Sequence, residues 1–439
     1  MNIKIKPASS ITPAELSRAT TDDSRMADVR KSVISIIDAV RQRHDAAVLE
    51  FTQKFDGVEF TPADLKVPES QIAAALASVD ASVVQALKTA KANIEKFHAN
   101  QLRPDWEIET TKGVTAGLIT RPLDTVGIYV PGGKAFYPST VLMCAVPAIV
   151  AGVRRVVMVT PPKKDKSIEP IVLASASIAG IKEIYKIGGA QAIAALAFGT
   201  ETIPKVEAIV GPGNAYVSTA KQLLQGQVLI DSPAGPSEVL IVAGENASPK
   251  LVALDMCAQA EHDQDAVAMA VVTSDAQARE IVTEIEKLVK TLDRKDILNV
   301  SLEKNGLIVV LGKTTKDASF IVETARVVNT IAPEHLHLNL DVVTAKKLLP
   351  MITNAGAIFV GETSPVALGD YASGTNHVLP TNGMAKRYSA LNTWNFLKMI
   401  PVTTASKLGL KNLSKTVSTL ARFEKLDAHA RSVEDRVKE

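Results

Sequence analysis

The sequence is poor in several features that mark whole classes of protein. Only two of its 439 residues are cysteines, Cys144 and Cys257, and neither lies in the paired spacing of a zinc knuckle. So few thiols exclude a disulfide-dense scaffold and fit a reducing compartment. No charge sign dominates, because 49 basic and 47 acidic side chains leave a net charge of +2. This balance excludes the extended field that attracts nucleic acid or anionic lipid.

Long apolar runs are also missing. The longest, VLMCAVPAIVAGV from Val141, is shorter than a membrane span and contains Pro147, so we interpret it as a buried crossover helix. The N-terminal stretch MNIKIKPASSITPAEL has neither the apolar core of a secretory signal nor the arginine-rich character of a transit peptide. We therefore expect a cytoplasmic protein with no nucleic-acid partner and no membrane partner.

The pattern that is present predicts an α/β protein with more than one domain. Residues 26 to about 101 have apolar positions at helical spacing, which predicts long amphipathic helices. Short apolar runs then alternate with helical stretches in two series, the first beginning at VGIYVPGG and the second at EVLIVAG. Such alternation is typical of parallel strands joined by crossover helices, and it favours ligand sites at the carboxyl ends of the strands.

The histidines are concentrated in the second half of the chain, among carboxylates and amides. In the segment QAEH, Gln259 and His262 are three residues apart on a predicted helix, so both side chains can face one ion. Imidazole and carboxylate groups are favoured zinc ligands, and a glutamine oxygen is a less usual one. A helix C-terminus with a surface glutamine and a dipole-compatible histidine explains the same segment, and on spacing alone this is the stronger interpretation.

Two further patterns are compatible with chemistry. In IAPEHLHL, Glu334 and His335 follow a proline at a turn, where a histidine can remove an alcohol proton and a carboxylate can activate water. An ordinary surface turn explains this pair equally well, and we expect His337 to be structural or exposed. The loops YVPGGK, KIGGAQ and VGPGN can direct backbone N–H groups at a phosphate, although none completes a known phosphate-binding motif and turn chemistry alone explains their glycines.

Taken in order, eight segments make the chain similar to the histidinol dehydrogenase family over nearly its whole length. One such segment alone would be weak support. The segments are GIYVPGGKAFYPSTVLM, GGAQAIAALAFGT, GPGNAYV, PAGPSEVLIVA, QAEHDQDA, APEHL, GDYASGTNHVLPT and EKLDAH.

The resemblance implies a four-electron, NAD-dependent oxidation of L-histidinol through L-histidinal to L-histidine, the last steps of histidine biosynthesis. His335 would be the acid and base, and Glu334 would activate the water that attacks the aldehyde. One zinc ion per subunit would be held by Gln259, His262, Asp370 and His429. Besides these ligands and His335, the substrate would contact Ser237, His377 and Glu424. The dinucleotide would lie near Tyr129, Gln191 and Asn214.

The resemblance also implies the architecture: two tandem, incomplete Rossmann-like domains with small terminal segments, in an intertwined homodimer with shared active sites. We expect an N-terminal segment at 1–25 and a discontinuous first domain at 26–128 and 238–380, carrying the metal and catalytic residues. A second domain at 129–237 would form the dinucleotide side. Residues 381–439 would form a basic helical tail that reaches the partner subunit, whereas the helical period alone allows the tail to pack on its own domain.

Three other functions fit parts of the sequence. A related zinc and NAD dehydrogenase could oxidise another small alcohol, such as a sulfonated diol, but the carboxylate of Glu424 suits a cationic or imidazole-bearing substrate better than an anion. A zinc hydrolase using Glu334 and bound water would reduce no nicotinamide. A noncatalytic metal or dinucleotide binder would have no use for the Glu334 and His335 pair.

Overall fold

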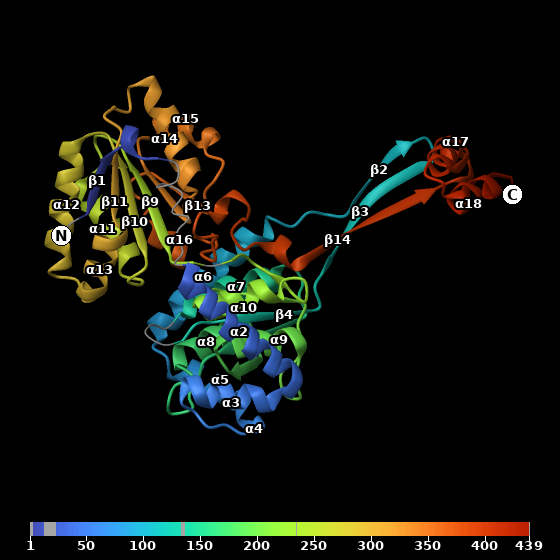
Figure 1. Ribbon diagram of the computed structural model, residues 1–439, viewed down its shortest axis with the longest axis horizontal. Coiled ribbons are helices and arrows are strands. Elements are labelled where there is room, and N and C mark those ends of the chain that lie inside the picture. The colour runs from blue at the N-terminus through green and yellow to red at the C-terminus, as the bar shows by residue number, and fades with distance from the viewer. Residues whose placement is uncertain (1–2, 13–22, 133–136, 234, 439) are drawn as a thin grey trace.

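The computed structural model describes residues 3–12, 23–132, 137–233 and 235–438, which form two lobes and an extended arm (Figure 1). Each lobe is built around one parallel sheet, and the arm contains a three-stranded antiparallel sheet. This confirms the predicted α/β fold with two series of parallel strands.

The first lobe has a six-stranded sheet in the order β1-β11-β10-β9-β12-β13. Its strands are rich in small and branched apolar residues and β9, β10 and β12 are buried along their whole length, as expected for a sheet covered on both faces. The strands are β1 (Lys4–Pro7), β9 (Glu238–Ala243), β10 (Val267–Val272), β11 (Leu307–Val310), β12 (His335–Asn339) and β13 (Ala357–Val360).

Helices cover both faces of this sheet and form a hydrophobic core on each. One core includes residues of α11 (Pro249–Ala260), α12 (Asp275–Val289) and α13 (Lys295–Asn305). The other includes residues of α14 (Ala318–Ile331) and α15 (Val342–Leu348). The lobe is completed by the short helices η1 (Ala8–Ser10), η2 (Leu349–Met351) and α16 (Val366–Tyr371).

The second lobe has a five-stranded sheet in the order β6-β5-β4-β7-β8. Helices α5 to α8 form the core on one face, and α2, α3, α9 and α10 form the core on the other. The strands are β4 (Thr125–Tyr129), β5 (Arg155–Thr160), β6 (Glu183–Lys186), β7 (Ala208–Val210) and β8 (Leu229–Ile230). The helices are α2 (Asp23–Arg43), α3 (Asp45–Asp56), α4 (Pro62–Leu65), α5 (Glu69–Ser78), α6 (Ala81–Ala99), α7 (Pro138–Val150), α8 (Pro170–Ala179), α9 (Gly189–Phe198) and α10 (Ala215–Leu224).

The arm joins two distant parts of the chain. Strand β14 (Leu397–Ala405) pairs antiparallel with β3 (Val114–Pro122), which also pairs with β2 (Trp106–Thr111). Helices α17 (Lys407–Phe423) and α18 (Asp427–Lys438) follow at the tip, far from both lobes in Figure 1. The connection into the arm contains η3 (Met384–Lys386) and η4 (Thr393–Phe396).

The packing differs from the expected domain boundaries in three places. The helices within 26–128 pack on the second lobe, where α2 contacts α9 and α10, α5 contacts α8, and α6 contacts α7. Within the expected N-terminal segment 1–25, β1 belongs to the first lobe, because it pairs with β11. The tail 381–439 is not helical throughout, because it contains β14. Apolar periodicity predicts that a face is buried but does not say against which sheet.

Candidate active site

The candidate catalytic residues lie where the second lobe connects to the first. The chain leaves β8 and reaches β9 at Glu238, and its neighbour β12 begins at His335, opposite Val239. Glu238 and His335 therefore stand at the amino edge of the first sheet. The strand pattern favoured the carboxyl edge as the place of ligand sites. The candidates lie at the amino edge because β9 follows directly from the second lobe, so this is the edge of the first sheet that the connection reaches.

The imidazole of His335 is held in one orientation by the backbone of Glu238. Its Nδ1 lies 2.9 Å from the carbonyl oxygen of Glu238, which can only accept, so Nδ1 carries a hydrogen. Its Nε2 lies 3.3 Å from Oδ1 of Asp370. Nε2 is therefore the nitrogen that can exchange a proton with a bound molecule.

Glu334 is anchored beside it. Its Oε2 accepts a hydrogen bond of 2.7 Å from the backbone N–H of Glu238 and lies 3.6 Å from Nδ1 of His335. Both Glu334 and His335 are 5% exposed, so their charges interact in a nearly dry environment.

The electrostatic environment raises the pKa values of both members of this pair. Burial raises the pKa of Glu334 to about 8, against the opposing charge of His335. Burial alone would lower the pKa of His335, but the carboxylates of Glu334 and Asp370 outweigh it and raise that pKa to about 9. Groups coupled this closely titrate as one unit, and groups with pKa values in this range can act as general acids and bases.

The structure brings part of the predicted metal site together. Gln259 and His262 stand at the C-terminal end of α11, and Asp370 is on α16. Desolvation by the surrounding protein lowers the pKa of His262, although the residue is exposed to solvent, and this favours the neutral imidazole that a metal requires. Burial would raise the pKa of Asp370, but the contact with His335 and the imidazoles around it lower the value and keep the carboxylate ionised.

His377 and Ser237 lie beside these residues. Nδ1 of His377 is 2.8 Å from the carbonyl oxygen of Asp370, and its Nε2 is 3.2 Å from Oγ1 of Thr140 in the second lobe. Burial lowers the pKa of His377. Ser237 is half-buried directly before β9. The predicted substrate residues of the lobes thus surround the junction between them.

Two predicted site residues lie elsewhere. Glu424 ends α17 and His429 is on α18, and both are exposed on the arm (Figure 1). Across the described parts of the chain, no three His, Cys, Asp or Glu side chains are grouped closely enough to hold a metal ion. Within one chain the structure therefore places three of the four predicted zinc ligands at the lobe junction and the fourth at the tip of the arm.

The three predicted dinucleotide residues follow strands of the second sheet at its carboxyl edge, as expected. Tyr129 ends β4, and its hydroxyl accepts a hydrogen bond of 3.2 Å from Gly189 N–H. Burial raises the Tyr129 pKa to about 12, so the phenol keeps its proton. Gln191 is 1% exposed and its Oε1 has no hydrogen-bond partner among the described residues. Asn214 caps α10 by accepting from the N–H groups of Tyr216 and Val217.

Sequence reasoning missed the central role of Glu238. Its backbone binds both catalytic candidates, and its Oε1 accepts a hydrogen bond of 2.6 Å from Asn382 N–H. The signal was a buried acidic residue opening the apolar strand EVLIVA. His337 is structural, as one of the two expectations had it, because its ring nitrogens contact Asp255 Oδ2 and Gly361 O, each at 2.9 Å.

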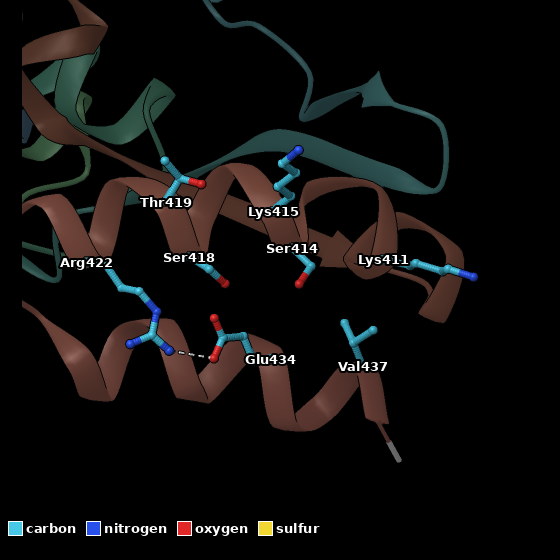
Figure 2. Close-up of a pocket in the computed structure, with 8 residues that line it drawn as sticks. All are labelled: Lys411, Ser414, Lys415, Ser418, Thr419, Arg422, Glu434 and Val437. Atoms are coloured by element: carbon cyan, nitrogen blue, oxygen red, sulfur yellow. Dashed lines mark hydrogen bonds and ion pairs between the residues drawn. The ribbon is translucent and has the colours of Figure 1, made fainter.

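A separate open pocket lies between the two helices of the arm. Its volume is about 460 Å³, and Figure 2 shows Arg422 paired across it with Glu434. None of the predicted site residues lines it. The lining residues are Lys411, Ser414, Lys415, Ser418, Thr419, Arg422, Glu434 and Val437.

Known proteins match the chain over nearly its full length. Residues 18–437 match the sequence pattern of the family described as histidinol dehydrogenase. A histidinol dehydrogenase of Methanothermobacter thermautotrophicus is 48% identical over 94% of each chain, and one of Lactococcus lactis is 45% identical over 94% of each. The crystal structure of histidinol dehydrogenase from Elizabethkingia anophelis is similar with a TM-score of 0.91 and 38% identity, covering 100% of this chain and 98% of that one.

Proposed function

The chain belongs to the histidinol dehydrogenase family, and from this premise we propose that it oxidises L-histidinol with NAD, through L-histidinal, to L-histidine. The observation that carries the proposal is the buried pair of Glu334 and His335 at the lobe junction, with half-buried Asp370 beside His335. A nitrogen base and a separate carboxylate in one dry site suit two successive oxidations of one carbon.

In the first oxidation, His335 acts on the alcohol. Its Nδ1–H is bound to the Glu238 carbonyl, so Nε2 of the neutral imidazole takes the hydroxyl proton while the carbinol carbon gives hydride to NAD. The product is the aldehyde and reduced nicotinamide. The near-complete burial of His335 keeps solvent from the reactive aldehyde.

In the second oxidation, Glu334 activates water. The carboxylate takes a proton as the water oxygen adds to the aldehyde carbon, and protonated His335 gives its proton to the aldehyde oxygen, which forms the hydrate. The hydrate then gives hydride to a second NAD and one hydroxyl proton to His335, which leaves the carboxylic acid. The pKa of about 8 leaves enough of the basic form at neutral pH for this role. The hydrogen bond from Glu238 N–H fixes the carboxylate, so the same backbone unit positions both catalytic groups.

The residues at the junction fit a zinc ion in donor chemistry. A neutral imidazole from His262, an ionised carboxylate from Asp370 and the buried amide of Gln259 are all competent ligands. When bound, zinc supplies a positive charge that anchors the amino alcohol through its nitrogen atoms and compensates the carboxylate. We propose one zinc per subunit, with His429 as the fourth protein ligand.

We further propose a homodimer in which the arm of each subunit brings Glu424 and His429 to the partner's lobes. Support comes from the position of these residues at the tip of an arm, away from the junction that holds the other ligands. His377 and Ser237 would contact the substrate from the lobes, while Tyr129, Gln191 and Asn214 would contact NAD. Free, buried Cys144 and Cys257 suit a cytoplasmic location.

The stoichiometry of the reaction tests the activity. Purified protein should form two reduced nicotinamides per L-histidinol consumed, lose this activity on chelation and regain it with zinc. One per substrate would mean that the aldehyde is released. No reduction by metal-loaded protein would overturn the proposed function.

Subunit mixing tests the shared site. His335→Asn and His429→Ala would each inactivate a homodimer, but refolding the two variants together forms hybrids with one site built only from wild-type residues. If subunits assort at random, the mixture should recover about one quarter of wild-type activity. No recovery, with dimers present, would contradict an arm that serves the partner.

Among the described residues, no single helix is long and apolar enough to cross a membrane, and α5 with α6 meets that length and composition only as a pair bent by 111°.

A further inference from the structure

A buried ion pair in the second lobe holds a single peptide from both sides. Lys221 on α10 and Asp231 after β8 form an ion pair through Nζ and Oδ1, with side chains 3% and 5% exposed. Lys221 Nζ also donates to the carbonyl oxygen of Gly211 over 2.9 Å. Asp231 Oδ2 accepts from the N–H of the same glycine over 2.7 Å. Both backbone groups of Gly211 are thus bound by the two members of one pair.

The held residue stands at a place where no other amino acid fits. Gly211 has φ +112°, and a Cβ there would lie 2.2 Å from the carbonyl oxygen of Tyr129. The backbones at the ends of β4 and β7 are therefore pressed together, and the loop 211–214 starts from this contact. The loop ends at Asn214, whose side chain caps α10, the helix that carries Lys221. Both ends of the loop are consequently tied to α10.

A buried ion pair contributes little net stability to a protein. Removing two charges from water costs several kcal/mol per ion in proteins, and an apolar pair of the same volume is often as stable. An apolar pair makes no directional contacts, because it cannot hydrogen-bond to the N–H and C=O groups of one residue. The Lys221–Asp231 pair makes both hydrogen bonds and therefore fixes the orientation of the loop.

We propose that Lys221 and Asp231 are positioning residues for dinucleotide binding, acting through Gly211 on the loop 211–214. The inference rests on the proposed function, in which this loop lies with Tyr129 and Gln191 at the carboxyl edge of the second sheet. Open α/β sheets bind ligands at this edge, and a loop displaced by an ångström loses contacts with them. Neither residue takes part in proton or hydride transfer.

A double variant tests this role. Lys221→Met with Asp231→Asn removes both charges together, so no unpaired charge stays buried, and the asparagine oxygen can still accept from Gly211 N–H. The KM for NAD and the Kd for NADH should rise on the order of ten- to hundredfold. Turnover at saturating NAD, the KM for L-histidinol and the zinc content should change less than about twofold, because only binding of the dinucleotide is affected.

A control and a second variant keep the test decisive. Arg155→Gln breaks the exposed Arg155 and Glu183 pair on the same sheet and should leave the KM for NAD unchanged. Asp231→Glu keeps both charges but moves the carboxylate by one methylene, and it should raise the KM for NAD as well.

A folded double variant with a wild-type KM for NAD would overturn the proposal. Failure of both variants to fold would assign the pair to stability and overturn it too. A wild-type protein that does not reduce NAD would instead refute the proposed function.

Discussion

The lobes bury their large apolar side chains, whereas the arm leaves many of its apolar side chains exposed to solvent. In the lobes, Phe320 on α14 is fully buried, and β9 and β10 are buried at every position. In the arm, Phe423 at the end of α17 is 89% exposed, and eight of the nine residues of β14 are exposed. A lobe completes its core within one chain, whereas the arm presents apolar surface of the kind that marks an interaction site.

The same contrast applies to the polar residues. At the lobe junction, Glu334 and His335 are buried and His377 is half-buried, each is bonded to the backbone, and their pKa values are shifted. Glu424 and His429 on the arm are exposed to solvent. The lobes therefore contain a preorganised acid–base group, and the arm carries residues that need another surface to act on.

The largest effect expected from this contrast is in the lobes. His335→Asn should lower turnover by roughly 10²–10⁴, because the amide can still donate to the Glu238 carbonyl but offers no base at the position of Nε2. Steady-state NADH formation at saturating substrates measures it. His337→Asn, two positions along the same strand, should lose stability rather than turnover, since His337 holds Asp255. Near-normal turnover of His335→Asn would remove His335 from the mechanism.

Glu334→Gln should separate the two half-reactions. The amide oxygen can still accept from Glu238 N–H, but it cannot take a proton from water, so aldehyde oxidation should slow more than alcohol oxidation. A general base contributes on the order of 10²–10⁴ to its step. Single-turnover rates with L-histidinol and with L-histidinal measure the two steps, and equal losses in both would argue against water activation.

The packing contrast predicts unequal losses of stability. Phe320→Ala should lower the free energy of unfolding by about 3–5 kcal/mol, because it opens a cavity in a fully buried core. Phe423→Ala should cost less than about 0.5 kcal/mol in the single chain and should instead weaken the proposed dimer. Denaturant unfolding at low protein concentration measures the stability of the single chain, and sedimentation measures association, so the two effects can be told apart. Equal losses at low concentration would mean that the Phe423 ring is buried within its own chain.

A smaller effect concerns pH. Burial lowers the pKa of His98, which is fully buried on α6 and bonded through Nδ1 to the Ile94 carbonyl. Below the unfolded-state value of 6.5, the unfolded chain binds a proton that the folded chain does not. The free energy of unfolding therefore decreases as the pH is lowered below this value. His98→Gln should reduce this slope by at most about 1.4 kcal/mol per pH unit.

Much of the fold was predictable because parallel strands covered on both faces leave continuous apolar runs such as EVLIVA and VAMAVV. The packing of α2 to α6 on the second lobe was not, since an amphipathic helix does not specify its partner. Glu334 and His335 were recognisable as neighbours in sequence. The hydrogen bonds from Lys221 and Asp231 to the backbone of Gly211 were not recognisable in the sequence. They join residues on separate elements through backbone atoms, and no spacing of residue types indicates them.

The register between β3 and β14 also sets an order of events during synthesis. The nine paired positions join segments about 280 residues apart, so β2 and β3 leave the ribosome long before β14 exists. During that interval β3 has one open edge, which is the kind of surface on which nascent chains aggregate. The arm is therefore finished only after both lobes have been made, so the dimerisation proposed for it would have to wait until translation is almost complete.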